Sequence, residues 1–270
     1  MVVSHPASAP YIANAVRADT VAPDSLISGG NPSPRTSLAP YWQFHAAVTR
    51  AQLVAWLPRG QRLLIDVSGP GATSAELAAE AGHTVLRVLD DASNAPPPQH
   101  RPPGRLRTLI GDTSSLGFLP DGCADGVIAG DRTLSTHLAA EGMVAEIARV
   151  LRPAGRLLAS VDSLVLGMAV LADQHRWAHL VDLPHAEVVL VPWPDGSITR
   201  CYGIDQLREL LAGAGLTVSW MRPLTVLSES MVTHLLRQDP DSMPRLVRAE
   251  LGARSDESLG AQLVVSAYKG

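Results

Sequence analysis

Acidic residues and glycines recur where short apolar runs end, and this combination can bind a small polar ligand. Asp66 closes the apolar run that starts at Leu63, and Gly69 and Gly71 follow within five residues. Glycine has no Cβ atom, so such a turn lets the backbone approach a ligand closely. A strand, a glycine turn and a helix start together form a frequent ligand site at the carboxyl edge of an open sheet. The pattern predicts a small polar ligand here.

A second acidic group stands at a spacing that suits a nucleoside. Asp90 and Asp91 follow the next apolar run, about 20 residues beyond the glycine turn, where a carboxylate can accept hydrogen bonds from ribose hydroxyls. A ribose occurs in NAD and in S-adenosylmethionine alike. Because glycine turns alone are a weak motif, this spacing leaves both cofactors open.

Alternating apolar segments predict the scaffold that positions these residues. The expected strands are Leu63 to Asp66, Thr84 to Leu89, Leu106 to Ile110, Ala124 to Ala129 and Arg156 to Val161. Helices are expected at Ala75 to Ala81 and Leu138 to Leu151, and a turn at 152–155 separates the second helix from the last of these strands. Thr73 and Glu76 read as a capping box for the first of these helices. Strands that alternate with helices in this way indicate βαβ units and a parallel sheet.

The flanking regions are less regular. Residues 1–40 are rich in Pro, Ser, Ala and Gly and read as a flexible arm, and a helix with an aromatic start follows from Tyr41 to Leu57. The remaining expected elements are a helix over 164–181, a hairpin of 188–191 with 198–202 around the Asp-Gly turn at 195–196, a helix over 204–214, a strand over 216–221, a helical segment over 230–251 and a final strand over 261–268. A hairpin near the chain end would give the sheet an antiparallel edge.

Composition narrows the class of protein. The net charge of −4 argues against a general nucleic-acid binder, and two cysteines are too few for a disulfide scaffold. No run approaches the ~20 apolar residues that cross a bilayer, and the first residues lack the pattern of a secretory signal. We therefore expect a cytoplasmic protein without nucleic-acid or membrane partners.

Three downstream motifs favour one family. They are Gly111-Asp112, the turn LPDGCADGVI over 119–128 and the segment EIARVLRPAGRLL over 146–158. In this order the chain resembles the class I S-adenosylmethionine-dependent methyltransferases, especially their small-molecule branch, over about residues 59–162. The resemblance implies a doubly wound, mostly parallel seven-stranded sheet with an antiparallel C-terminal edge. One domain would span 41–270, with an N-terminal helical cap and substrate-side insertions in 163–255.

The resemblance also implies roles for individual residues, with S-adenosylmethionine as the cofactor. The methionine end would lie against Asp66, Ser68, Gly69 and Gly71; the ribose against Asp90 or Asp91; the adenine edge near Asp112 and Thr113; and both cofactor and acceptor near Ala129 and Gly130.

The chain departs from the family pattern at both ends of this site. Ser68 and Pro70 stand where the family has glycines, and Leu89 aligns with the ribose-binding acid, one place before Asp90. Neighbouring residues of a strand face opposite ways, so Asp90 can serve only if the strand has ended. These departures keep open a binding or regulatory protein with a degenerate pocket. Gly69, Gly71 and Asp90 keep open a second alternative, a dinucleotide-dependent oxidoreductase.

The residue that carries the reaction is harder to identify. His137, shortly after the fourth strand, is the best-placed candidate for a general base. His175 and His179 stand four apart on the expected helix, but no third ligand accompanies them, so we expect no metal. The expected partner is a small-molecule acceptor whose reacting atom is not defined, and the oligomeric state, including a homodimer, stays open.

Overall fold

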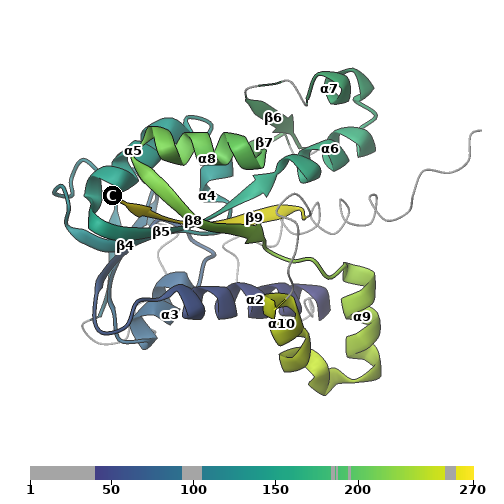
Figure 1. Ribbon diagram of the computed structural model, residues 1–270, viewed down its shortest axis with the longest axis horizontal. Coiled ribbons are helices and arrows are strands. Elements are labelled where there is room, and N and C mark those ends of the chain that lie inside the picture. Colours follow the sequence, from purple (N-terminus) through teal and green to yellow (C-terminus); the bar gives the residue numbers. More distant parts are fainter. Residues whose placement is uncertain (1–39, 93–104, 184–185, 187, 194–195, 253–259) are drawn as a thin grey trace, which may run out of the picture.

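One mixed sheet forms the centre of the protein. The computed structural model describes residues 40–92, 105–183, 186, 188–193, 196–252 and 260–270. Within them the strands run in the order β3-β2-β1-β4-β5-β9-β8, and the hairpin β6-β7 lies beside the end of β5 (Figure 1). Their bounds are β1 Leu63–Asp66, β2 Thr84–Leu89, β3 Leu106–Ile110, β4 Ala124–Ala129, β5 Leu151–Ser163, β6 Val189–Pro192, β7 Ile198–Tyr202, β8 Leu216–Pro223 and β9 Gln262–Lys269.

The strand directions confirm the expected fold class. The strands β1 to β5 pair in parallel, whereas β9 runs antiparallel to both β5 and β8. The seven strands from β3 to β8 thus form a mostly parallel sheet with an antiparallel C-terminal edge. The hairpin β6-β7 extends it, since β7 pairs with β5 at Asp162 and Ser163, beyond the last residue that pairs with β4.

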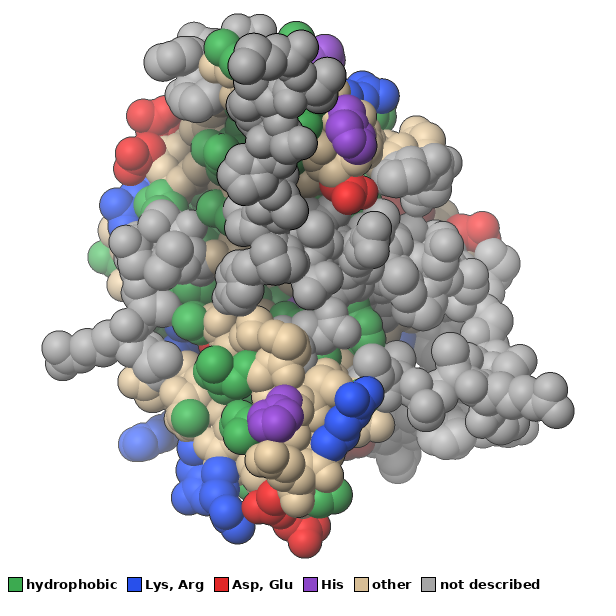
Figure 2. Space-filling view, turned by 90° about the vertical axis from the view of Figure 1, so that its right-hand side faces the viewer, with side chains coloured by type: hydrophobic (Ala, Val, Ile, Leu, Met, Phe, Trp, Pro, Cys, Tyr) green, Lys and Arg blue, Asp and Glu red, His purple; other side chains and the backbone are tan. Residues whose placement is uncertain are grey.

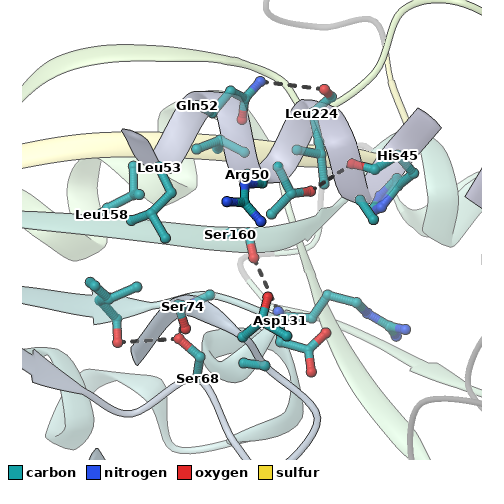
Figure 3. A pocket seen from close by; sticks show the side chains of 18 of the residues that line it. His45, Arg50, Gln52, Leu53, Ser68, Ser74, Asp131, Leu158, Ser160 and Leu224 are labelled. Atoms are coloured by element: carbon teal, nitrogen blue, oxygen red, sulfur yellow. Dashed lines mark hydrogen bonds between the residues drawn. The ribbon is translucent and has the colours of Figure 1, made fainter. Parts of the chain in front are cut away.

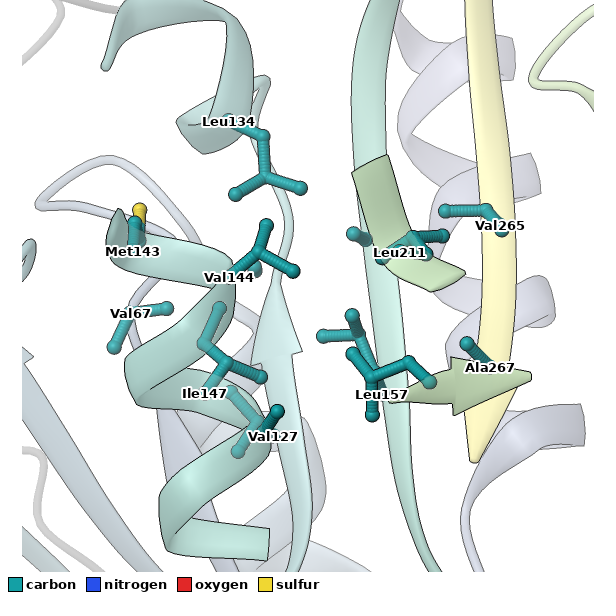
Figure 4. Packing of buried hydrophobic residues seen from close by; sticks show 14 of the residues in the cluster. Val67, Val127, Leu134, Met143, Val144, Ile147, Leu157, Leu211, Val265 and Ala267 are labelled. Carbon is teal, nitrogen blue, oxygen red and sulfur yellow. The ribbon is translucent and has the colours of Figure 1, made fainter. Parts of the chain in front are cut away.

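Helices cover both faces of the sheet. On one face lie α2 (Pro40–Trp56), α3 (Ser74–Glu80), α9 (Glu229–Gln238) and α10 (Met243–Gly252); on the other lie α4 (Thr133–Thr136), α5 (Ala140–Val150), α8 (Ile204–Gly213), and, beside the hairpin, α6 (Leu164–Asp173) and α7 (Trp177–Asp182) (Figure 1). Fully buried Val144, Ile147 and Leu211 pack from α5 and α8 onto Leu157 and Val265 of the sheet (Figure 4). Burying such side chains stabilises the fold by about 1.5–3 kcal/mol each.

Several local expectations were wrong. The segment 164–181 is two helices instead of one, because the chain turns between them at His175, whose φ is 58°. His175 and His179 therefore do not share one helix. The segment 230–251 is likewise divided, with a short 3₁₀ turn at Pro240–Ser242 between α9 and α10. Proline lacks an N–H and interrupts a helix in this way.

The expected capping box and the expected turn before the fifth strand both differ from the structure. Thr73 makes no side-chain cap to α3, and Glu76 forms an ion pair with Arg87 of β2 in place of the expected capping box. Residues 152–155, expected as a turn, lie inside β5 as a bulge: Leu151 pairs with Ala124, and Arg156 already pairs with Gly126. The break in regular pairing is where the turn was expected.

The C-terminal strand is fastened to the end of α5. The Nζ atom of Lys269 donates hydrogen bonds to the carbonyl oxygens of Arg149, at 3.5 Å, and Leu151, at 2.8 Å. The last carbonyls of a helix lack partners within the helix, and a lysine there satisfies them and complements the helix dipole.

The surface around α9 mixes residue types. Figure 2 shows apolar, basic, acidic and histidine side chains interspersed in its lower part, where the view of Figure 1 places α9. No helix in the part of the chain described is long and apolar enough to cross a membrane. The arm expected over residues 1–40 lies outside the described residues, apart from Pro40 at the start of α2.

Candidate functional site

The loop after β1 is held by the acid that ends the strand. Asp66 is buried, and its Oδ1 accepts a hydrogen bond from the Ser68 backbone N–H at 2.8 Å, while its Oδ2 accepts one from the Ser74 hydroxyl at 2.5 Å. Burial raises the pKa of Asp66, and the hydrogen bonds from Ser74 and Ser68 oppose that rise. Gly69 has a φ of 91°, a conformation that favours glycine. Asp66 thus shapes the loop instead of facing the open space beside it.

Ser68 links this loop to the one that follows β4. Its hydroxyl accepts a hydrogen bond from the Gly130 N–H at 2.8 Å and lies 3.4 Å from the Ile128 carbonyl oxygen. A Cβ atom on Gly130 would stand 3.1 Å from the same hydroxyl oxygen. Ser68 therefore connects the loop after β1 to the loop after β4 by a hydrogen bond.

The turn after β4 has an uncommon backbone. Asp131 and Arg132 have φ values of 52° and 63°, two successive left-handed residues that are not glycine. Such conformations cost about 1–3 kcal/mol each and persist where surrounding contacts impose them, often at functional sites. The Ser160 hydroxyl accepts the Arg132 N–H at 3.1 Å and helps to impose this one.

A buried ion pair anchors the same turn. The Arg132 guanidinium contacts both carboxylate oxygens of Asp162, at 2.7 and 2.8 Å, and lies 5.4 Å from the centre of the Trp193 ring. Asp162 has no exposed surface, so desolvation raises its pKa, and Arg132 opposes that rise. With the Arg132 side chain held on Asp162, the Asp131 side chain is left on the open side of the turn.

Both loops open into one pocket under α2. The cavity measures about 220 Å³ and lies between α2 and the ends of β1, β4 and β5 (Figure 3). Its described walls include Trp42, His45, Thr49, Arg50, Gln52, Leu53, Ser68, Gly71, Thr73, Ser74, Leu77, Ile128, Gly130, Asp131, Arg132, Leu158, Ser160, Leu224, Gln262 and Val264. Seven of these residues are large and apolar and eleven are polar or charged, so the pocket combines apolar walls with polar groups that can orient a small molecule.

Two opposite charges face this pocket from opposite walls. Asp131, from the turn after β4, is the one carboxylate among the described lining residues. Arg50 extends from α2 toward the sheet (Figure 3) and makes no ion pair with any residue that the structure describes. Asp131 reaches solvent through the pocket, yet crowding by protein raises its pKa; Arg132 opposes the rise, and Asp66 and Asp162 add to it.

His45 gives the α2 wall a neutral polar group. Burial lowers the pKa of His45 to about 4, and a hydrogen bond with Gln262 partly opposes this. The imidazole is therefore uncharged near neutral pH, with one ring nitrogen able to accept a hydrogen bond. Trp42 lies beside it in an edge-on ring contact, with centroids 5.5 Å apart.

The ends of β2 and β3 carry a separate cluster. β2 ends at Leu89, so Asp90 lies just outside the strand, and its two oxygens accept the Thr113 N–H at 2.7 Å and the Thr113 hydroxyl at 3.0 Å. His137 Nε2 lies 3.1 Å from that hydroxyl, and its Nδ1 donates to the Thr133 carbonyl at 2.9 Å. The carboxylate expected to bind ribose is thus already engaged by protein groups.

The other expected residues have more local surroundings. Asp112 accepts hydrogen bonds from the N–H and the hydroxyl of Ser114, which lower its pKa. Ala129 is fully buried, whereas Gly130 lines the pocket. Asp91 is exposed beside Asp90. Gly71 lines the pocket, and His137 is outside the described lining.

Sequence reasoning missed three pocket residues: His45, Arg50 and Asp131. The aromatic cluster from Tyr41 to His45 was a partial signal, because aromatic residues before the first strand can cap a pocket. Nothing in sequence spacing marks Asp131, since its exposure depends on the left-handed turn.

Known proteins resemble this chain in sequence over part of its length and in fold. A methyltransferase-domain family model matches residues 65–159, while no curated protein matches the chain at a significant level. A Burkholderia thailandensis 1,6-didemethyltoxoflavin-N1-methyltransferase, solved with its substrate and S-adenosylhomocysteine, is 19% identical over 99% of this chain and 93% of its own, with a TM-score of 0.52.

Two further structures have the same fold. A Listeria monocytogenes protein described as a putative S-adenosylmethionine-dependent methyltransferase is 14% identical over 84% of this chain and 99% of its own, with a TM-score of 0.59. One from Mesorhizobium loti is 15% identical over 84% and 100%, with a TM-score of 0.55. Identities this low show the fold alone. The protein therefore has the fold of these S-adenosylmethionine-dependent methyltransferases, and its residues 65–159 match the methyltransferase domain.

Proposed function

We propose that the protein transfers the methyl group of S-adenosylmethionine to a nitrogen or oxygen atom of a small molecule. One observation carries the proposal: a single cavity is lined both by the loop after β1, at Ser68 and Gly71, and by α2, at Trp42 and His45. The first wall belongs to the cofactor side of the methyltransferase domain, and the second is free for an acceptor. Donor and acceptor would therefore meet in one cavity.

The residues of the pocket suit this reaction. The cofactor supplies a methyl group on a sulfonium, and in-line attack forms the new bond to carbon as the carbon–sulfur bond breaks. The protein has mainly to align the acceptor and exclude water. Leu53, Leu158 and Val264 supply the apolar walls, and neutral His45 can accept a hydrogen bond from the acceptor's N–H or O–H.

The volume of the cavity and a structurally similar enzyme both support a small-molecule acceptor. A cavity of about 220 Å³ admits a small molecule beside the end of a cofactor. The Burkholderia enzyme, which spans nearly the same length, carries a small bound heterocycle according to its description. By analogy with that enzyme, we propose that the acceptor of this protein is a compact aromatic or heteroaromatic molecule.

Turnover tests the proposal. The protein is incubated with S-adenosylmethionine and a panel of phenols and N–H heterocycles, and S-adenosylhomocysteine release and methylated product are followed by mass spectrometry. We expect product with at least one acceptor class. In a separate calorimetric titration, NAD is added to the protein, and we expect no binding of NAD.

A second candidate function is a binding protein that keeps the fold without the reaction. The engaged carboxylate of Asp90 favours it, because ribose hydroxyls must compete with Thr113. Tight S-adenosylhomocysteine binding with no turnover over the whole panel would support this candidate and contradict the enzyme. Binding of NAD in place of S-adenosylhomocysteine would contradict both.

A further inference from the structure

The altered glycine loop leaves the amino-acid end of the cofactor in need of other partners. Pro70 has no N–H to donate, and the Ser68 hydroxyl and both oxygens of Asp66 are already hydrogen-bonded within the protein. The α-carboxylate and α-ammonium of a methionine moiety both require charged or polar partners once they leave water. Charged side chains elsewhere in the pocket can supply such partners.

The pocket contains one group of each required sign. Arg50 is a guanidinium without an ion-pair partner in the described part of the chain, and Asp131 is the one acid in the described lining. The second cation of the described lining, Arg132, is paired with Asp162. Figure 3 shows Arg50 reaching from α2 and Asp131 from the opposite wall, with the cavity between them. A zwitterion placed between these walls would meet a complementary charge at each end.

The backbone around Asp131 supports a ligand role. The left-handed pair at Asp131 and Arg132 is held by the Ser160 hydroxyl and by the buried Arg132–Asp162 pair. This framework keeps a carboxylate in the pocket against the desolvation that raises its pKa. Strain and desolvation kept together at one residue are typical of a binding site.

We infer that Arg50 and Asp131 form a side-chain clamp for the amino-acid end of the cofactor, Arg50 binding the α-carboxylate and Asp131 the α-ammonium. The clamp adds charged side-chain contacts to those that the loop residues Gly71 and Thr73 can offer from the pocket wall. The inference rests on the proposed function, since it assumes that S-adenosylmethionine binds in this pocket.

The test compares two ligands that share a nucleoside. S-adenosylhomocysteine has the amino-acid end, and 5′-methylthioadenosine lacks it. We expect wild-type protein to bind S-adenosylhomocysteine more tightly in a calorimeter. Arg50→Gln and Asp131→Asn should each weaken S-adenosylhomocysteine binding about tenfold or more, as loss of a charged hydrogen bond does, and change 5′-methylthioadenosine binding less than twofold.

Matched controls separate the clamp from general effects. Arg59→Gln removes an exposed arginine outside the described pocket and should leave both affinities unchanged, while Arg50→Lys keeps the charge and should retain most of the binding. Arg50 is exposed on a helix, so Arg50→Gln tests the inference even if Asp131→Asn unfolds the strained turn.

The outcomes against the clamp are distinct. Equal loss for the two ligands, or wild-type-like S-adenosylhomocysteine binding by Arg50→Gln, overturns the clamp and leaves the proposed function intact. Wild-type protein that binds neither ligand overturns the proposed function and the clamp together.

Discussion

The two ends of the proposed cofactor site differ in how many hydrogen bonds their charged groups make within the protein. At the pocket under α2, Arg50 and Asp131 face open space. At the ends of β2 and β3, Asp90 is held by both the N–H and the hydroxyl of Thr113, and His137 contacts that hydroxyl in turn. The charged groups under α2 can therefore pair with a charged ligand, whereas those at the ends of β2 and β3 are hydrogen-bonded to one another.

This difference suggests how binding energy is distributed. Asp90 already accepts one hydrogen bond on each oxygen, and a further bond from a ribose hydroxyl, exchanged against water, contributes only about 0.5–1.5 kcal/mol net. Charged groups that face a pocket without internal partners lose no such bond. We therefore expect the amino-acid end to contribute most of the cofactor affinity.

The largest effect should follow from breaking the frame of the amino-acid end. Asp162→Ala leaves the Arg132 guanidinium without its partner, and loss of one member of a buried pair costs about 3–5 kcal/mol. Urea unfolding measures the loss of stability. The double replacement Arg132→Met with Asp162→Leu removes both charges and should recover much of it. A single variant as stable as the double one would contradict the anchoring role.

A smaller effect is expected at the ends of β2 and β3. Thr113→Val removes the hydroxyl bonds to Asp90 and His137, which should lower stability by about 1–2 kcal/mol. The same change leaves one Asp90 oxygen free for ribose, so binding of 5′-methylthioadenosine should tighten. Thr113→Ser keeps a hydroxyl and is the control. Weaker nucleoside binding by the valine variant would show that this cluster helps to bind the ligand.

The pH dependence of stability should depend on His45 in the pocket under α2. Because the folded-state pKa of His45 is about 4 and the ordinary value is 6.5, the unfolded chain binds more protons between these values. This residue's contribution to stability is therefore complete above pH 6.5 and decreases as the pH falls toward 4.

Comparing wild type with His45→Gln isolates that contribution. The difference in melting temperature between the two proteins should shrink across this window, by roughly 2–4 °C for each kcal/mol lost. A difference that stays constant from neutral pH to pH 4 would place His45 in contact with solvent.

The smallest effect is expected for Ser68→Gly, which restores a family glycine. The variant loses the hydrogen bond from Gly130, so stability should fall by about 1 kcal/mol. Affinity for S-adenosylhomocysteine should change little, because the serine hydroxyl is already engaged. A large gain in affinity would mean that the serine obstructs the site.

Sequence periodicity predicted the fold well where packing is regular. The five parallel strands and the hairpin were found close to their expected positions because buried strands and an Asp-Gly turn leave clear patterns. The prediction of one continuous helix over 164–181 was wrong, because the left-handed backbone at His175 that ends the first helix does not change the pattern of apolar residues. The bulge at 152–155 likewise depends on pairing with β4, which a sequence does not display.

The site was predictable only in part, for physical reasons. Asp66 and Asp90 are easy to find at strand ends, but their hydrogen bonds to Ser74 and Thr113 decide whether they are free to bind a ligand. Arg50 enters the site from a helix that precedes the first strand. Such a contact depends on how α2 packs across the sheet, and no motif spacing encodes it.

The lysine at the end of β9 gives the protein an unusual chemical handle. Lys269 is the only lysine of the chain, so its ε-amino group is the only side-chain amine that an acylating reagent can modify. Its donated hydrogen bonds to Arg149 and Leu151 must open before acylation. The labelling rate would therefore report how often the Lys269 ammonium group leaves the carbonyl oxygens of Arg149 and Leu151, and a fluorophore attached there would mark a defined position at the end of β9.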